Sequence, residues 1–153
     1  MGNPGRFQGI QLMRNTLPQK NRFIWHQGPA LFWAIMIFIL SSFSSLAPPV
    51  VVFNFQDKLN HFIFYGIFGI FLARAFFYQD KMGWARRHWQ FAAVLFGVLY
   101  GISDEFHQYF VPGRCVEFWD VVADGLGASF GVMLFYYRGV FKRMVGFFKQ
   151  KSE

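Results

Sequence analysis

Long apolar runs constrain the fold of this chain more than any other feature. Pro29 to Leu46 contains 18 residues and no charge, close to the about 20 residues that a helix needs to cross a hydrocarbon core of about 30 Å. Leu59 to Tyr78 is similar and has one formal charge, Arg74, near its end, where a long side chain reaches water. Because lipid offers no water to unpaired backbone groups, such segments must be helical.

Two further runs are short and polar at one end. Trp89 to Ile102 covers 14 residues, so a spanning helix that contains it must continue to about His107, past two acidic residues. The fourth run, Val121 to Tyr137, has Asp124 one turn inside its start. We therefore predict an all-α fold: a polytopic membrane helical bundle with four transmembrane helices.

The composition supports a membrane protein over a soluble one. Hydrophobic residues make up 54% of the chain and charged residues 15%, whereas an ordinary soluble domain has about 25% charged residues. The net charge of +7 does not indicate a nucleic-acid partner, because the basic residues lie beside apolar runs and form no basic face. The single cysteine, Cys115, excludes an intrachain disulfide and a cysteine-based metal cluster.

The distribution of charge predicts the orientation. With four spans, both termini and the 79–88 loop share one side, and this side holds every Lys and Arg except two. Cytoplasmic flanks carry such an excess, so we place both termini in the cytoplasm. The other side then holds six acidic residues and the two remaining basic ones: Asp57, Asp104, Glu105, Glu117, Asp120 and Asp124 with Lys58 and Arg114.

These assignments divide the chain into three segments. The basic first 28 residues and the apolar run that follows them resemble a signal peptide, with a cleavage-like site at Ser45–Ala47. Because this apolar run is longer than the core of a typical signal peptide and Pro48 follows the site, we expect an uncleaved anchor. A short amphipathic helix is expected at Phe7–Leu17. The segments are a basic cytoplasmic N-terminal segment (1–28), a four-helix transmembrane domain (29–137) and a basic cytoplasmic tail (138–153).

Small residues spaced four apart occur in the third and fourth runs. Such spacing lets membrane helices approach closely, so we expect these two spans to pair. The two series are Ala93, Gly97 and Gly101, and Ala123, Gly127 and Gly131.

Polar residues gather at the outer ends of the last three runs. Five of the eight acidic residues lie between positions 104 and 124, and helical spacing predicts three shared faces. These faces are Asp57, His61 and Tyr65 on the second run, Asp104, His107 and Gln108 on the third, and Glu117, Asp120 and Asp124 on the fourth.

A tight turn is expected between the third and fourth runs. Pro112 restricts φ at one position and Gly113 can adopt φ > 0 at the next. Such a turn folds Arg114 back over the acidic helix ends.

The acidic residues outnumber their available partners. Acids within a span normally have a partner, so the surplus is protonated, solvated in an outward-facing pocket, or balanced by a bound cation or cationic ligand. The structural alternative is a set of helix caps and ion pairs, which we prefer for Lys58 and Glu117. For Asp104, Glu105 and Asp124 both roles stay open. Metal ligation by His61, His107 and carboxylates stays open, but no metal-binding motif such as HExxH is present, so we assign no metal ligands; the sequence does not identify a cofactor.

Four motifs resemble the VanZ-like family of small bacterial integral membrane proteins. They are Asp57-Lys58-Leu59-Asn60-His61-Phe62 with Tyr65-Gly66, Ser103-Asp104-Glu105-Phe106-His107-Gln108, Val111-Pro112-Gly113-Arg114, and Asp120 through Asp124 to Gly127. The likeness covers a core of residues 57–137 and departs at Asp124, where the family often has Asn. It implies a role at the cell envelope and a location in the bacterial inner membrane.

We interpret the chain as a protein that binds or modifies an amphiphilic envelope component, such as a lipid-linked sugar or a lipid headgroup. The expected partners are membrane lipids and a lipid-linked envelope precursor, with a homo-oligomer left open. The alternative is a non-enzymatic structural or partner-binding membrane subunit; a transporter would require a dimer. Whether the protein is an enzyme stays open. Candidate catalytic residues are Glu105, His107 and Asp104, and candidate ligand-binding residues are Asp57, Lys58, His61, Arg114, Gln108, Asp120 and Asp124.

Overall fold

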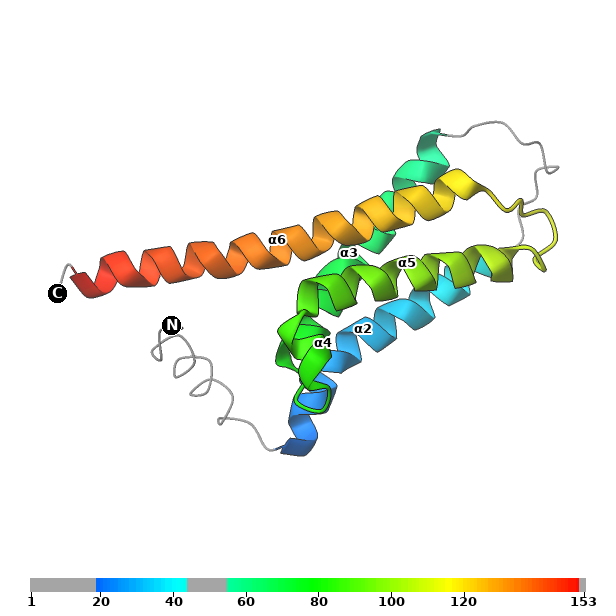
Figure 1. Ribbon diagram of the computed structural model, residues 1–153. Helices are drawn as coiled ribbons and strands as arrows, with labels where there is room; N and C mark the ends of the chain where they lie inside the picture. Colours follow the sequence, from blue (N-terminus) through cyan, green and yellow to red (C-terminus); the bar gives the residue numbers. More distant parts are fainter. Residues whose placement is uncertain (1–18, 44–54, 152–153) are drawn as a thin grey trace.

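All regular structure in the described part of the chain is helical (Figure 1). The computed structural model describes residues 19–43 and 55–151, with side chains at 23–43 and 55–141. The expected helix at Phe7–Leu17 and the cleavage-like site at Ser45–Ala47 lie outside these residues. The helices are α2 (Gln19–Ser41), α3 (Phe55–Tyr78), α4 (Gly83–Arg87), α5 (Trp89–Gln108) and α6 (Phe118–Lys151).

Three of the described helices are long and apolar enough to cross a membrane by length and composition. These segments are Phe23–Ser41 in α2, Phe55–Tyr78 in α3 and Phe118–Phe141 in α6. They agree with a multi-pass integral membrane protein. The fourth predicted span, α5, has 20 residues but does not belong to this group, because the polar residues in its last turns lower its hydropathy.

The helix bounds differ from the apolar runs at their polar ends. α3 begins at Phe55, four residues before the run, and has Asp57 in its first turn, where a carboxylate is favoured by the helix dipole. α6 begins at Phe118 with Asp120 in its first turn. It then continues to Lys151, so the fourth apolar run and the basic tail form one helix.

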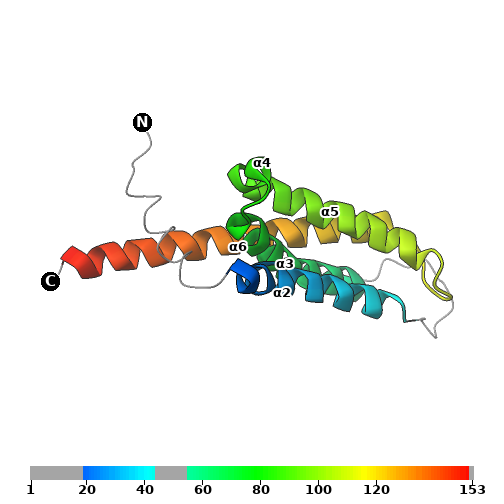
Figure 2. The same cartoon turned by 90° about the horizontal axis from the view of Figure 1, so that it is seen from below.

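The long helices form a bundle in which α3 is central. α3 contacts α2, α5 and α6, and α6 extends beyond the other helices toward the C-terminus (Figures 1 and 2). The end of α2, the start of α3, the end of α5 and the start of α6 lie at one end of the bundle, and α4 lies at the other. The acidic residues of three helices are thereby brought to the same end.

Glycines let α3 and α6 touch along their backbones. A Cβ atom added at Gly127 would overlap the carbonyl oxygen of Phe62, and one added at Gly131 would overlap the carbonyl oxygen of Gly66. Gly69 likewise lies against the backbone of Ala128. This backbone contact is closer than side chains at these positions would allow.

The predicted pairing of α5 with α6 is present but uses only one of the two series. A Cβ atom at Gly97 would lie 2.8 Å from the Cβ of Ala128, and one at Gly101 would lie 2.7 Å from Oδ2 of Asp124. Gly127 and Gly131, by contrast, face α3. The prediction did not consider α3 as a partner of α6, although the glycines of α3 let the backbones of these two helices come into contact.

Two hydrogen bonds to backbone carbonyls fix α2 against the bundle. The indole nitrogen of Trp33 donates to the carbonyl oxygen of Phe64 over 2.9 Å, and the hydroxyl of Tyr100 donates to that of Ala34 over 2.7 Å. Because a carbonyl oxygen has two lone pairs, it accepts a second donor without losing its helical bond. α2 is thus bound to both α3 and α5.

We predict that Gly131→Ala lowers the stability of the bundle by about 1–3 kcal/mol, because the added methyl group forces α3 and α6 apart. Gly139→Ala is the matched control, since a Cβ there meets nothing within 4 Å, and it should be neutral or stabilising by up to about 1 kcal/mol. Thermal unfolding of both purified variants in detergent measures the difference. Equal effects of the two changes would contradict the proposed backbone contact.

Candidate functional site

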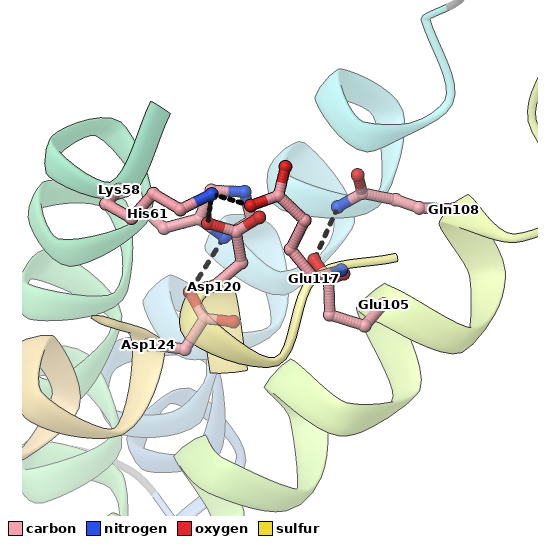
Figure 3. Close-up of polar contacts among 7 residues, drawn as sticks. All are labelled: Lys58, His61, Glu105, Gln108, Glu117, Asp120 and Asp124. Carbon is pink, nitrogen blue, oxygen red and sulfur yellow. Dashed lines mark hydrogen bonds and ion pairs between the residues drawn. The ribbon is translucent and has the colours of Figure 1, made fainter. Parts of the chain in front are cut away.

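Acidic residues of α5 and of the start of α6 meet Lys58 and His61 of α3 in one cluster at the end of the bundle (Figure 3). Lys58 and His61 come from the first turns of α3, Glu105 and Gln108 from the last turns of α5. Glu117 immediately precedes α6, and the other acidic members lie in its first two turns. Residues from both halves of the chain therefore contribute to a single site.

Lys58 forms the first ionic link between α3 and α6. Its side chain is buried, and its Nζ contacts Oε2 of Glu117 and lies 2.9 Å from Oδ1 of Asp120. The residue is 8% exposed, so solvent screens these attractions weakly. Its ammonium group therefore pairs with two of the acidic residues at the start of α6.

His61 forms the second link. Its Nδ1 lies 2.9 Å from Oδ1 of Asp124, and Asp124 is fully buried. The ring stacks against Tyr65, with centroids 6.4 Å apart. Within the described part of the chain, neither Oδ2 of Asp124 nor the hydroxyl of Tyr65 has a hydrogen-bond partner.

The side-chain amide of Gln108 binds both acidic residues near the end of α5. Nε2 of Gln108 donates to Oδ2 of Asp104 over 3.4 Å and to Oε1 of Glu105 over 3.3 Å. The other oxygen of Glu105 accepts the backbone N–H of Glu117 over 3.0 Å. Glu105 therefore connects the end of α5 to the segment that leads into α6.

The predicted tight turn is confirmed. The backbone N–H of Arg114 donates to the carbonyl oxygen of Val111 over 3.1 Å, and Gly113 has φ 78°, a value suited to the third residue of a type II turn. The Nε of Arg114 donates to the carbonyl oxygen of Phe43, just after α2, over 3.3 Å. Arg114 also lines a cavity together with Asp57 and Asp104, near the acidic helix ends over which the turn was expected to fold it.

A polar cavity of about 230 Å³ adjoins the cluster. Its charged and polar lining residues come from α2, α3, α5 and the turn, but most of its surface is apolar, with Ile37, Leu40 and Phe64 among the lining residues. This volume holds several water molecules or a small headgroup. The polar lining includes Asp57, His61, Tyr65, Asp104, Gln108 and Arg114.

A second hollow of about 600 Å³ lies between the end of α5 and the start of α6. Its lining is apolar, including Ile102, Phe106 and Val121, except for Glu105 and Glu117. An apolar hollow that borders two carboxylates thus lies beside the polar cavity.

The structure places His107 apart from the cluster. Its Nε2 lies 2.9 Å from Oγ of Ser42, and its ring centroid lies 4.4 Å from that of Phe38. Successive residues are about 100° apart around a helix, so Gln108 can face the cluster while its neighbour faces α2. Of the three candidate catalytic residues, only Asp104 and Glu105 lie in the cluster.

One group of residues has the composition of a metal site. Ligand atoms of Asp57, His61 and Asp120 all lie within 4.8 Å of one another. These side chains come from two helices that are distant in the sequence, so no contiguous motif indicated them. The residues that line the polar cavity and the apolar hollow likewise come from separate helices, so the sequence did not predict that they would meet.

Comparison with known proteins gives a family match and one informative relative. A family model described as VanZ/LLP1 matches residues 10–142. An uncharacterized protein of Schizosaccharomyces pombe is 33% identical over 100 residues, which are 65% of this chain and 58% of the relative. No solved structure matches. A relative in a eukaryote gives no support to the bacterial source that the motifs implied.

We predict that Lys58→Met lowers the free energy of unfolding by about 3–5 kcal/mol, because it leaves buried carboxylates without their cation. The matched control is Arg86→Met, which removes the cation of a half-exposed pair, Arg86–Asp80 at 3.3 Å, and should cost no more than about 1 kcal/mol. Equilibrium unfolding in detergent compares the two. A loss of the same size in both variants is the result that would count against a stabilising role for the buried pair.

Proposed function

This chain belongs to the VanZ/LLP1 family, and we propose that its polar cavity binds or modifies the headgroup of an amphiphilic membrane component. The observation that carries the proposal is the cavity itself, where carboxylates, an amide and a guanidinium converge beside apolar walls. Few precisely placed polar groups within an apolar surround are typical of ligand sites.

The orientation of the cavity is part of the proposal. α5 crosses the membrane as a fourth span, both termini are cytoplasmic, and the cavity opens to the outer side. Arg86 and Arg87 of α4 support this orientation, because they lie at the opposite end of the bundle and cytoplasmic flanks are enriched in basic residues.

The apolar hollow beside the cavity suits the chain of an amphiphile. Gln108 donates to Asp104, which lines the polar cavity, and to Glu105, which lines the apolar hollow. The two spaces are thus separated by one hydrogen-bonded group. An acyl or isoprenoid chain in the hollow would bring its headgroup to the polar residues.

The lining favours a headgroup that has both hydroxyl and phosphate groups. Asp57 and Asp104 accept hydrogen bonds from hydroxyls, whereas Arg114 donates to a phosphate. Lys58 is already held between two carboxylates, so we assign it to the scaffold and not to the ligand. A lipid-linked sugar or a phospholipid headgroup meets these requirements.

In a catalytic form of this proposal, Asp104, which lines the polar cavity, acts as a general base toward a hydroxyl of the bound headgroup. Glu105 lines the apolar hollow instead. His107 contacts α2 instead, and its role in the proposal is to position the end of α5.

The structural alternative also has a specific observation in its favour. The pairs that involve Lys58 and His61 join α3 to α6, as expected if the charges only fasten the helices. A non-enzymatic structural or partner-binding subunit would need no ligand in the cavity.

We predict that a discrete amphiphile copurifies with the wild-type protein and is depleted at least tenfold in Arg114→Ala, because one charge-assisted contact contributes about 1.5–3 kcal/mol. The proteins are extracted in native lipid and their lipids identified by mass spectrometry. Arg87→Ala, an exposed residue of α4, is the matched control and should retain the species.

Folding must be equal for this comparison, so the thermal stability of each variant is measured on the same sample. If wild type and folded Arg114→Ala carry only the same bulk lipids, the structural alternative is favoured and a ligand-binding cavity is rejected.

A further inference from the structure

We propose that Asp57, His61 and Asp120 bind one divalent metal ion, Zn²⁺ or Mn²⁺, in the wall of the polar cavity. The site goes beyond the proposed function, since metal binding needs no amphiphile. Its ligand atoms already lie within 4.8 Å of one another. Small side-chain rotations bring them to the distances of about 2.0–2.2 Å from the ion that such ligands adopt.

The positions of the ligands follow from the fold. Asp57 and His61 are one turn apart on α3, where side chains four residues apart share a face. Asp120 lies in the first turn of α6, which the glycine contacts hold against α3. Two rigid helices therefore position all three groups.

His61 is oriented by a second carboxylate. Its Nδ1 lies 2.9 Å from Asp124. In the neutral ring, the form that binds a metal, an N–H at Nδ1 would donate to the carboxylate and Nε2 would keep its lone pair. Metal-ligating histidines almost always donate their other ring N–H to a carboxylate, a carbonyl or water. Asp124, fully buried, supplies that group here.

An unpaired hydroxyl in the same cavity independently indicates a ligand. Tyr65 is 1% exposed, it lines the cavity together with Asp57 and His61, and its hydroxyl has no hydrogen-bond partner among the described residues. A buried hydroxyl without a partner costs about 1–3 kcal/mol. Water or a headgroup oxygen in the cavity would provide the missing partner.

The charge balance also favours a cation. Within the described residues, six acids surround this end of the bundle, and the basic groups there are Lys58, His61, His107 and Arg114, of which His107 contacts Ser42 and Phe38. Asp120 pairs with Lys58 through Oδ1. Because a carboxylate has two oxygens, it can hold an ammonium group with one and a metal with the other.

The ligand set selects the kind of ion. Imidazole suits Zn²⁺ and other transition metals, whereas carboxylates also suit Mn²⁺. Mg²⁺ prefers carboxylates and water to a nitrogen ligand. Three protein ligands would leave a coordination position open, as in catalytic zinc sites, and two of the three, Asp57 and His61, line the cavity.

The test is metal titration of the full-length protein, purified with a tag that contains no histidine and stripped with a chelator. Calorimetry with ZnCl₂ and with MnCl₂ should show one saturable site for at least one of the two ions. Asp57→Asn should weaken the affinity at least tenfold, since it removes an anionic ligand from a half-buried position. Asp80→Asn, at the other end of the bundle, is the matched control and should bind like wild type.

Electron paramagnetic resonance of the Mn²⁺ complex tests the histidine without a substitution, and it should show coupling to an imidazole nitrogen. Three results overturn the proposal: no saturable binding of either ion, unchanged affinity in folded Asp57→Asn, or bound Mn²⁺ without nitrogen coupling. Because no amphiphile is added, a failure here is distinct from a failure of the proposed function.

Discussion

The ionic contact between α3 and α6 is the interaction on which the rest of this structure depends. A charge in a low-dielectric environment needs a partner, and Lys58 and His61 on α3 meet Glu117, Asp120 and Asp124 at the start of α6. The contact requires closely spaced helices, and glycines on both helices allow their backbones to touch. Packing and charge pairing therefore specify the same register, which fixes the end of α5 and the turn that follows it.

The same contact gathers more polar groups than it pairs. Gln108 satisfies Asp104 and Glu105, but Tyr65 and one oxygen of Asp124 stay unpaired in the described structure. Natural structures leave few buried polar groups unsatisfied, and each such group calls for an explanation. The proposed ligand would supply a partner for Tyr65, which lines the cavity. Asp124 does not line it, and its Oδ2 lies against Gly101 of α5.

The sequence was sufficient for features that are local or periodic. Apolar runs predicted the helices, spacing predicted that Asp57 and His61 share a face, and Pro112-Gly113 predicted the turn. Contacts between helices that are distant in the sequence were harder to predict. Gly127 and Gly131 face α3 because Gly66 and Gly69 offer a closer surface, and His107 faces α2 although Gln108 next to it faces the cluster. The association of Asp57 and His61 with Asp120 depends on how two distant helices meet, which no spacing within one helix encodes.

The most direct test of this account is a double-mutant cycle on His61→Gln and Asp124→Asn, with the free energy of unfolding measured in the same detergent for all four proteins. Residues that interact directly typically show coupling energies of about 0.5–3 kcal/mol. The account predicts a value in the upper half of that range, because the pair is buried and joins two helices. Effects that add to within about 0.5 kcal/mol would show that His61 and Asp124 act independently, and would contradict the claim that this buried pair helps to hold α3 to α6.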